Sequence, residues 1–305
     1  MTDIVKELID ASLSGRDRDI EYAIKHAIDS DKSAKDKQYR EKRMQQLINR
    51  QAKKMEVPAN CSMFVVVEPE AEICMERYFM TKRDSDLIDR IIKQHVVSKA
   101  LNEKGIRSVN AVLLYGEPGV GKTTLGRAIA HVLDIPFVYL NLSYVLDSYL
   151  GGTQKNIANA FRFIKGKECV FMLDEIDTIT ARRGQKNEVG ELTRITVSIM
   201  QELDSLGGET ILLGATNRLD IIDEAVLSRF GTPYEVLRLI NEERKKYVLK
   251  YLLSAEIEAS EEEIISLYEK DRTQRDLEKA IIAYISEKLY MELDLESNWK
   301  EKADN

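Results

Sequence analysis

The stretch "GEPGVGKTT" at residues 116–124 combines glycines, a lysine and two threonines in a spacing suited to hold phosphate groups. It follows the apolar run "AVLLY" and precedes "LGRAIAHVL", so we expect a strand, a glycine loop and a helix in that order. Glycines let several backbone N–H groups point into one concavity, and the helix N-terminus adds a favourable dipole. Lys122 would place its charge on the β- and γ-phosphates of a nucleotide, and Thr123 would offer a hydroxyl to Mg²⁺. The residues expected to contact the nucleotide are Glu117, Pro118, Gly119, Val120, Gly121, Lys122, Thr123 and Thr124.

A second motif, "CVFMLDEID" at residues 169–177, places two acids at the end of an apolar run, with Asp174 52 residues after Lys122. Ligands in open α/β sheets bind at the carboxyl ends of the strands. Asp174 would hold Mg²⁺ there through water, and Glu175 is the candidate base that activates the attacking water. The alternative for such a pair is an acidic turn on the surface.

Two further polar residues follow apolar runs later in the chain. "TILLGATNR" at 210–218 ends with Asn217, whose amide could position the lytic water or contact the γ-phosphate, or could belong to an ordinary turn. "DEAVLSRF" at 223–230 contains Arg229, a residue type that is usually exposed at the end of a helix.

The elements that would position these residues can be read from hydrophobic periodicity. Apolar runs of strand length lie at 111–115, 137–141, 169–173, 210–215 and 234–239, with amphipathic helices between them. This alternation predicts an α/β fold with a parallel sheet covered on both faces. After residue 241 the pattern is helical to about 293, and residues 1–55 also have helical periodicity, including the run "DIEYAIKHAI".

The composition is that of a soluble globular chain of 305 residues, with 44% hydrophobic residues and a formal net charge of −7. This acidity disfavours a general nucleic-acid binder. Cys61, Cys74 and Cys169 lack the spacing of metal ligands, and no signal-peptide pattern precedes them, so we expect reduced thiols in the cytoplasm. No apolar run approaches the roughly 18–20 residues that span a membrane.

Five regions are predicted along the chain. These are an N-terminal helical substrate- or partner-binding region (1–55), a linker (56–82), a nucleotide-binding domain (83–240), a small helical domain (241–293) and a flexible tail (294–305). Within the first region, residues 32–54 carry nine Lys or Arg and two Asp or Glu. That segment is interpreted as a solvated helix or linker, with contact to nucleic acid or an acidic partner as the alternative.

With these motifs in order, the sequence resembles the AAA+ ATPases, and within them the AAA clade of ring-forming remodellers. "GEPGVGKTT", "VFMLDEID", "GATNR" and "IDEAVLSRF" are similar to the Walker A, Walker B, sensor 1 and second-region-of-homology motifs, and the resemblance covers roughly residues 83–292. It implies a P-loop NTPase fold with a five-stranded parallel sheet in the order 5-1-4-3-2 and a C-terminal helical lid. ATP and Mg²⁺ are the cofactors implied, and the Asn217 strand would lie between the two Walker strands.

The resemblance also assigns a role to "LSYVLDSYLGGTQKNI" at 142–157, which is similar to the family's pore-loop segment. Tyr149 and Leu150 would then line a central channel and grip an unfolded polypeptide, since tyrosine offers a flat apolar face with few rotors. A tyrosine in the core is the alternative. Arg182 and Arg183 fall where a second pore loop would be.

Arginines complete the implied site. Arg229 matches the arginine finger, which reaches the nucleotide of the neighbouring subunit and stabilises the transferred phosphoryl group. Many family members carry two arginines in this region, and here Ser228 occupies one of those places. Arg275, in "TQRDLEKAI", falls on the sensor 2 helix, where it would contact the γ-phosphate or else pack on the lid surface.

The leading interpretation is therefore an ATPase that forms a ring homo-oligomer, expected to be a hexamer, and remodels or translocates a protein substrate. The whole chain, with its N-terminal helical hairpin and "EVGELTRITVSIMQELD" at 188–204, resembles bacterial and phage- or plasmid-borne AAA proteins, some of them encoded beside subtilisin-like proteases. Such a protease is a candidate partner. The alternatives are a loader or switch that acts on nucleic acid and a nucleotide-gated scaffold that binds an effector.

Overall fold

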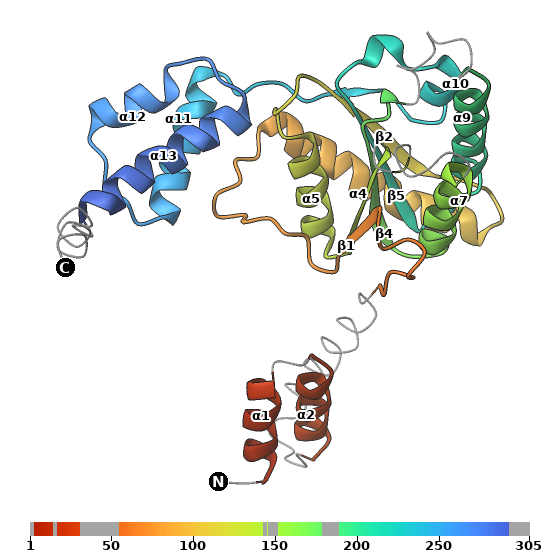
Figure 1. Ribbon diagram of the computed structural model, residues 1–305, viewed down its shortest axis with the longest axis horizontal. Helices are drawn as coiled ribbons and strands as arrows, with labels where there is room; N and C mark the ends of the chain where they lie inside the picture. Colours follow the sequence, from red (N-terminus) through yellow and green to blue (C-terminus); the bar gives the residue numbers. More distant parts are fainter. Residues whose placement is uncertain are drawn as a thin grey trace, which may run out of the picture. The chain divides into compact units, whose positions relative to one another are not determined.

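The computed structural model describes residues 3–14, 17–30, 55–142, 145, 152–178 and 189–292 of the chain. It divides into two compact units, Met1–Glu56 and Val57–Asn305. In the first unit, helices α1 (Asp3–Ser14) and α2 (Asp17–Ser30) pack against each other (Figure 1). Ala23 is buried between them, and His26 Nδ1 lies 2.6 Å from Glu7 Oε2.

A six-stranded mixed sheet forms the centre of the second unit. Its order is β1-β3-β4-β5-β2-β6, and β1 runs antiparallel to β3 while the other neighbours are parallel. Numbered along the chain without β1, the parallel strands lie in the order 5-1-4-3-2. The strands are β1 (Val65–Glu68), β2 (Asn110–Tyr115), β3 (Phe137–Asn141), β4 (Cys169–Asp174), β5 (Thr210–Thr216) and β6 (Tyr234–Glu235).

The sheet contains the five expected parallel strands but differs from the expectation in two respects. First, the valine run of β1, which we interpreted as part of a linker, pairs along β3 and covers what would be a free edge. Valines suit this position because β-branched side chains fit a pleated surface, and Val65 is buried while Val66 faces outward. Second, β6 ends at Glu235, four residues earlier than expected, where it pairs with Tyr115, the last residue of β2.

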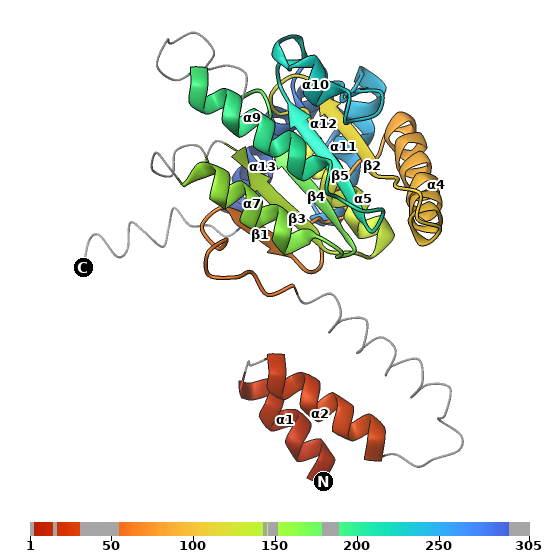
Figure 2. The ribbon, with the colours of Figure 1, turned by 90° about the vertical axis from the view of Figure 1, so that its right-hand side faces the viewer.

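Helices cover both faces of the sheet. Figure 1 shows α4 (Lys82–Glu103) and α5 (Lys122–Leu133) on one side, and α7 (Thr153–Ile164) and α9 (Val189–Leu203) on the other. The turned view in Figure 2 shows the same two layers. Leu87 and Ile91 of α4 and Leu125 and Ile129 of α5 are buried in one core with the strands, which fixes where α5 begins relative to the sheet. Two short helices, η1 (Leu219–Ile221) and α10 (Glu224–Leu227), follow β5.

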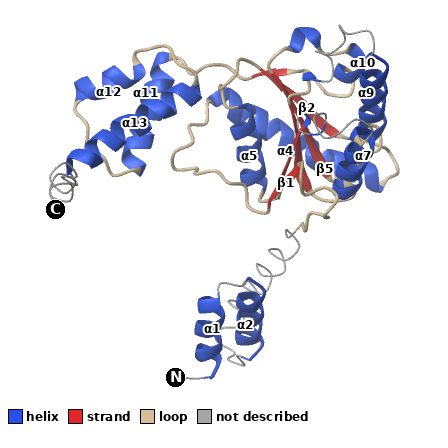
Figure 3. Ribbon diagram, in the orientation of Figure 1, coloured by secondary structure: helices blue, strands red, loops and turns tan. Residues whose placement is uncertain are grey.

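Three helices without strands follow β6: α11 (Asn241–Ser254), α12 (Glu261–Tyr268) and α13 (Gln274–Glu292) (Figure 3). We call them the C-terminal helices. They enclose a hydrophobic core of their own, formed by Val248, Tyr251, Leu252, Leu267, Leu277 and Ile281. Ser260 starts α12 by accepting a hydrogen bond from Glu263 N–H, while the Glu263 carboxylate accepts one from Ser260 N–H.

None of the helices in the described part of the chain combines the length and the apolar character needed to cross a membrane.

Candidate active site

A cavity of about 870 Å³ lies at the carboxyl edge of the sheet, between the glycine loop and the C-terminal helices. A volume of this size accommodates a nucleotide-sized ligand. Its walls come from segments far apart in the sequence: 72–79, the glycine loop with the start of α5, the end of β4, the end of β5, and α11 with α13.

The glycine loop runs from Gly116 to Gly121 and adopts backbone conformations that only glycine accepts readily. Gly119 has a φ of +83°, and a Cβ there would also press against Arg275 and Thr273 at 3.2 and 3.1 Å. A Cβ on Gly116 would overlap the carbonyl oxygen of Val236. The loop is therefore held between the segment that follows β6 and the start of α13, and α5 begins directly behind it at Lys122.

Lys122 is 8% exposed, and its ammonium is fully engaged. Nζ donates to the carbonyl oxygens of Gly116 and Glu117 at 2.9 and 3.0 Å and to Asn217 Oδ1 at 2.7 Å. Burial lowers the pKa of Lys122, and the carboxylates of Asp174 and Asp177 oppose that shift. The predicted pair of Lys122 and Asn217 thus meets in space, although 95 residues separate the two in sequence.

Asp174, the last residue of β4, lies next to Thr123 in the first turn of α5. Thr123 Oγ1 donates to Asp174 Oδ2 at 3.2 Å, and the Glu175 N–H donates to Asp174 Oδ1 at 2.9 Å. A hydroxyl and a carboxylate are the hard oxygen donors that Mg²⁺ prefers, so this pair fits the ion that the sequence predicted.

Glu175 lines the cavity one residue beyond Asp174. Its φ of 58° lies in the left-handed region, which costs a side-chain-bearing residue about 1–3 kcal/mol unless its surroundings hold it there. The N–H donated to Asp174 is one contact that holds it. Strain of this kind is concentrated at functional sites, which is consistent with the role expected for Glu175.

Tyr139 of β3 also belongs to this cluster, although our sequence analysis did not select it. Its hydroxyl donates to Asp174 Oδ2 at 3.0 Å and accepts from Asn141 Nδ2 at 3.4 Å. Burial raises the pKa of the phenol, and the Asp174 carboxylate adds to the rise, so the hydroxyl remains a proton donor. The only sequence signal was a hydroxyl-bearing residue in the otherwise apolar strand "FVYLN".

Two other predicted residues, Arg275 and Glu117, bond to the glycine loop or to Lys122 through backbone atoms. Arg275 lines the cavity, and its N–H donates to the carbonyl oxygen of Gly119 at 3.0 Å. The Glu117 carbonyl accepts from Lys122, but the Glu117 side chain turns away toward Arg238. Pro118, Val120 and Thr124, which were predicted to contact the nucleotide, line the cavity.

Arg229 lies outside the cavity lining of its own chain. Its guanidinium donates to Asp204 Oδ2 at 2.7 Å and to the carbonyl oxygens of Ala225 and Met200 at 2.5 and 3.3 Å. The side chain is 26% exposed. The structure therefore does not bring Arg229 together with Lys122 and Asp174 within one chain.

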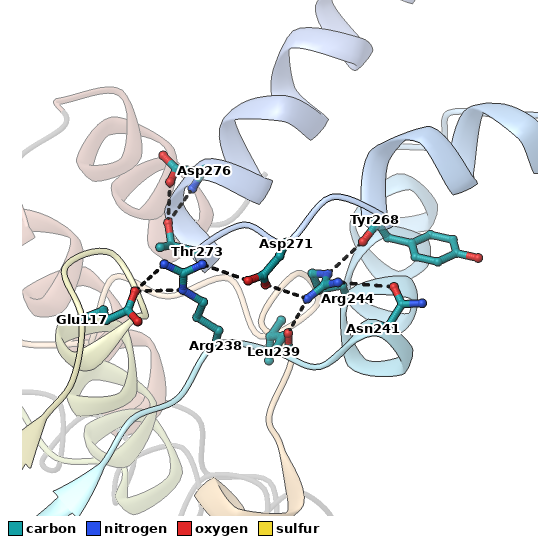
Figure 4. A network of polar contacts seen from close by, with 9 residues as sticks. All are labelled: Glu117, Arg238, Leu239, Asn241, Arg244, Tyr268, Asp271, Thr273 and Asp276. Atoms are coloured by element: carbon teal, nitrogen blue, oxygen red, sulfur yellow. Dashed lines mark hydrogen bonds and ion pairs between the residues drawn. The ribbon is translucent and has the colours of Figure 1, made fainter.

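A network of ion pairs joins the glycine loop to the C-terminal helices (Figure 4). Arg238 donates to Glu117 Oε2 through Nε and Nη2 at 2.8 and 2.5 Å, and to Asp271 Oδ2 through Nη1 at 3.0 Å. Asp271 Oδ1 accepts from Arg244 Nη1 at 3.1 Å. The buried Arg244 continues the network by donating to the carbonyl oxygen of Tyr268 at 2.8 Å.

The far end of the cavity consists of residues that sequence reasoning missed. Segment 72–79, expected to be part of a linker, lines the cavity beside residues of α11 and α13. Arg77 connects the two sides, since its Nε donates to Ser254 Oγ at 3.1 Å and its guanidinium lies 5.2 Å from the centre of the Tyr251 ring. Lys250 Nζ donates to the carbonyl oxygen of Tyr78 at 2.6 Å. No local motif marked these contacts.

The predicted pore-loop residues Tyr149 and Leu150, with Arg182 and Arg183, lie outside the described residues.

Comparison with known proteins agrees with this geometry. Residues 112–237 match the model of the "ATPase family associated with various cellular activities (AAA)". Residues 112–237 are therefore similar in sequence to an AAA ATPase domain. The matched region runs from β2 to the segment after β6 and includes the glycine loop, Asp174, Glu175, Asn217 and Arg229.

Individual relatives align with the same region of this chain, and the alignment covers only a small part of their own length. The chain is 35% identical over 133 residues to the peroxisomal ATPase pex6 of Schizosaccharomyces pombe, which is 42% of this chain and 14% of that protein. It is 36% identical over 129 residues to PEX6 of Yarrowia lipolytica (40% and 13%) and 34% identical over 147 residues to PEX6 of Kluyveromyces lactis (47% and 14%). The chain thus spans about one seventh of the length of these curated relatives.

Proposed function

We propose that this protein is a Mg²⁺-dependent ATPase that hydrolyses ATP to ADP and phosphate. The observation that carries the proposal is the meeting of Lys122, Asn217 and the Thr123–Asp174 pair at the carboxyl edge of β2, β4 and β5. A buried cation beside two oxygen donors for a metal ion suits a triphosphate better than it suits a neutral ligand. The match of residues 112–237 to the AAA family model and the similarity to relatives named as ATPases support the same function.

Each residue then has a defined task. Lys122 binds the β- and γ-phosphates and offsets their charge, and the N–H groups of the glycine loop orient them. Mg²⁺, when bound at Thr123 and Asp174, would neutralise charge that develops on the phosphoryl oxygens. Glu175 takes the proton of the attacking water, and Asn217 holds that water or the γ-phosphate in line. Arg275 would contact the γ-phosphate from α13.

We further propose that activity requires self-assembly into a ring, with a hexamer as the expected form. Arg229 would complete the site of a neighbouring copy, as a transition-state arginine supplied in trans. Its place on the surface, outside its own cavity, is compatible with that task. Its contact with Asp204 orients the guanidinium within the chain.

The substrate we propose is a protein, which the ring would remodel or translocate. Tyr149 and Leu150 would grip the polypeptide, the N-terminal unit would bind a substrate or partner, and the C-terminal helices would act as a lid that moves with the nucleotide. Action on nucleic acid, suggested by the basic segment 32–54, and pairing with a subtilisin-like protease remain alternative hypotheses. The described residues carry no observation that favours either of them.

The substitution Glu175→Gln tests the assignment directly. We expect the variant to bind ATP with unchanged affinity and to lose hydrolysis by about 100-fold or more, because the amide cannot accept the proton of the water. Phosphate release measures turnover, and equilibrium binding of a fluorescent ATP analogue measures affinity. Glu262→Gln, an exposed acid in α12, is the matched control and should behave as wild type.

The same assay tests assembly. Specific ATPase activity of the wild type should rise with protein concentration and fall toward zero on dilution, if the arginine comes from a neighbour. Full hydrolysis by Glu175→Gln would contradict the assignment of Glu175 as the general base. Constant specific activity in a diluted monomer would contradict the requirement for a ring.

A further inference from the structure

The hydroxyl of Tyr139 lies in the metal-binding cluster without being one of its expected ligands. Tyr139 and Asn141 are two residues apart on β3 and therefore project to the same face of the sheet. Asn141 is paired in register with Asp174 of the neighbouring strand. The phenol reaches diagonally along this face to Asp174 Oδ2, at 3.0 Å.

The direction of each hydrogen bond follows from the chemistry of the groups. An ionised carboxylate can only accept, so the phenol must donate its single proton to Asp174. The Asn141 amide donates to the phenol oxygen at 3.4 Å, which occupies a lone pair and keeps the O–H directed at Asp174. Tyr139 is therefore a donor of fixed orientation.

Asp174 accepts from three groups. Oδ1 accepts the Glu175 N–H, and Oδ2 accepts the hydroxyls of Thr123 and Tyr139. Thr123 is expected to turn its oxygen to a metal ion, whereas a phenol hydroxyl that donates to the carboxylate does not compete for that ion. Tyr139 can thus hold the carboxylate in one orientation whether or not an ion is present.

We propose that Tyr139 is a positioning residue that presents Asp174 to Mg²⁺ and so sets the affinity of the site for the ion. This inference rests on the proposed function, and it adds a residue outside the motifs that predicted the site. Groups that hydrogen-bond to metal ligands typically change metal affinity by about 10–100-fold when they are removed.

Tyr139→Phe is the variant to test, because it removes the hydroxyl and keeps the ring that packs 6.4 Å from Phe137, measured between ring centres. We would titrate Mg²⁺ against binding of N-methylanthraniloyl-ADP, a readout that needs no turnover, and separately against ATP hydrolysis. We expect the Mg²⁺ concentration at half-effect to rise about 10-fold in both titrations. ADP affinity in EDTA and kcat at saturating Mg²⁺ should stay within about twofold of wild type.

Tyr234→Phe provides a matched control. Tyr234 lies on β6 of the same sheet, and its hydroxyl donates to Asp84 Oδ1 of α4 at 2.9 Å instead of to Asp174. That variant should leave the Mg²⁺ titration unchanged. An unchanged titration in Tyr139→Phe would overturn the inference, as would equal shifts in both variants or a loss confined to kcat.

A double-mutant cycle separates action through Asp174 from a general effect. Once Asp174→Asn has removed the charge, adding Tyr139→Phe should not raise the Mg²⁺ concentration at half-effect any further, because the hydroxyl acts through that carboxylate. Additive losses would contradict the inference. If wild-type ADP binding did not respond to Mg²⁺, both the proposed function and this inference would be wrong. If binding responded but ATP were not hydrolysed, only the proposed function would fail.

Discussion

Two arginine–glutamate pairs flank the glycine loop, and they differ in burial. Arg127 of α5 donates through Nε to both oxygens of Glu68, at 2.9 and 3.0 Å, and through Nη2 to Oε1 at 2.7 Å. Arg238 makes a similar two-nitrogen contact with Glu117. The Glu68 side chain is 4% exposed, whereas that of Glu117 is 59% exposed.

The difference in burial gives the two pairs different tasks. A buried pair is costly to break, because the remaining charge has lost its water. An exposed pair contributes little, because water and salt replace it easily. We infer that the Glu68 pair fastens β1 to α5 as a fixed part of the domain. The Glu117 pair is a contact that the glycine loop and the C-terminal helices can make and break.

The largest effect on stability is expected for Glu68→Gln. The amide keeps the shape but removes the charge opposite Arg127, and Glu68 also accepts the Glu72 N–H at 2.9 Å. We expect the free energy of unfolding to fall by about 2 kcal/mol, less than for a fully buried pair because Arg127 is partly exposed. Urea denaturation measures this change. Glu70→Gln, an exposed acid two residues away, is the control, and equal losses in the two variants would refute the distinction.

A smaller and different effect is expected for Arg238→Ala. The substitution should leave the urea midpoint close to wild type, because the pair is exposed. It should raise the rate of ADP release by roughly 2–5-fold, because the link from Glu117 of the glycine loop through Arg238 to Asp271 is lost. Stopped-flow displacement of labelled ADP measures the rate. A large drop in stability would show that the network in Figure 4 is a structural support instead.

The smallest effect is expected from salt. Raising ionic strength to about 1 M shortens the screening length to roughly 3 Å, which weakens exposed pairs much more than buried ones. In high salt, the rate of ADP release from the wild type should approach the rate from Arg238→Ala. The rate from Arg238→Ala should change less with salt. A stability loss in salt equal to that of Glu68→Gln would contradict the comparison.

Part of the site could be predicted because its residues stand in short runs beside strands. Lys122 and Thr123 come shortly after β2, and Asp174 and Glu175 stand at the end of β4, so any parallel sheet brings them to one edge. Predicting that Asn217 lies at the same edge also required knowing that β5 lies between β2 and β4, which the resemblance implied.

Other residues could not be found in this way. β1 is a four-residue run whose partner strand begins 69 residues after Glu68, at Phe137, and short apolar runs do not reveal their partners. Tyr139 differs from a core tyrosine only through the hydrogen bond from its hydroxyl to Asp174. Glu117 was expected at the nucleotide, and only the path of the chain after β6 shows that its side chain meets Arg238.

The sequence by itself determined which residues form the proposed phosphate site, because glycines, a lysine and acids in fixed spacing need only their own strands and helices to come together. Tertiary structure alone decided which long-range contacts surround it: the pairing of β1, the phenol on Asp174, and the cavity wall formed by segment 72–79 with α11 and α13. The physical reason is that burial and hydrogen-bond partners depend on which distant segments pack together, whereas turn geometry and helix dipoles are local.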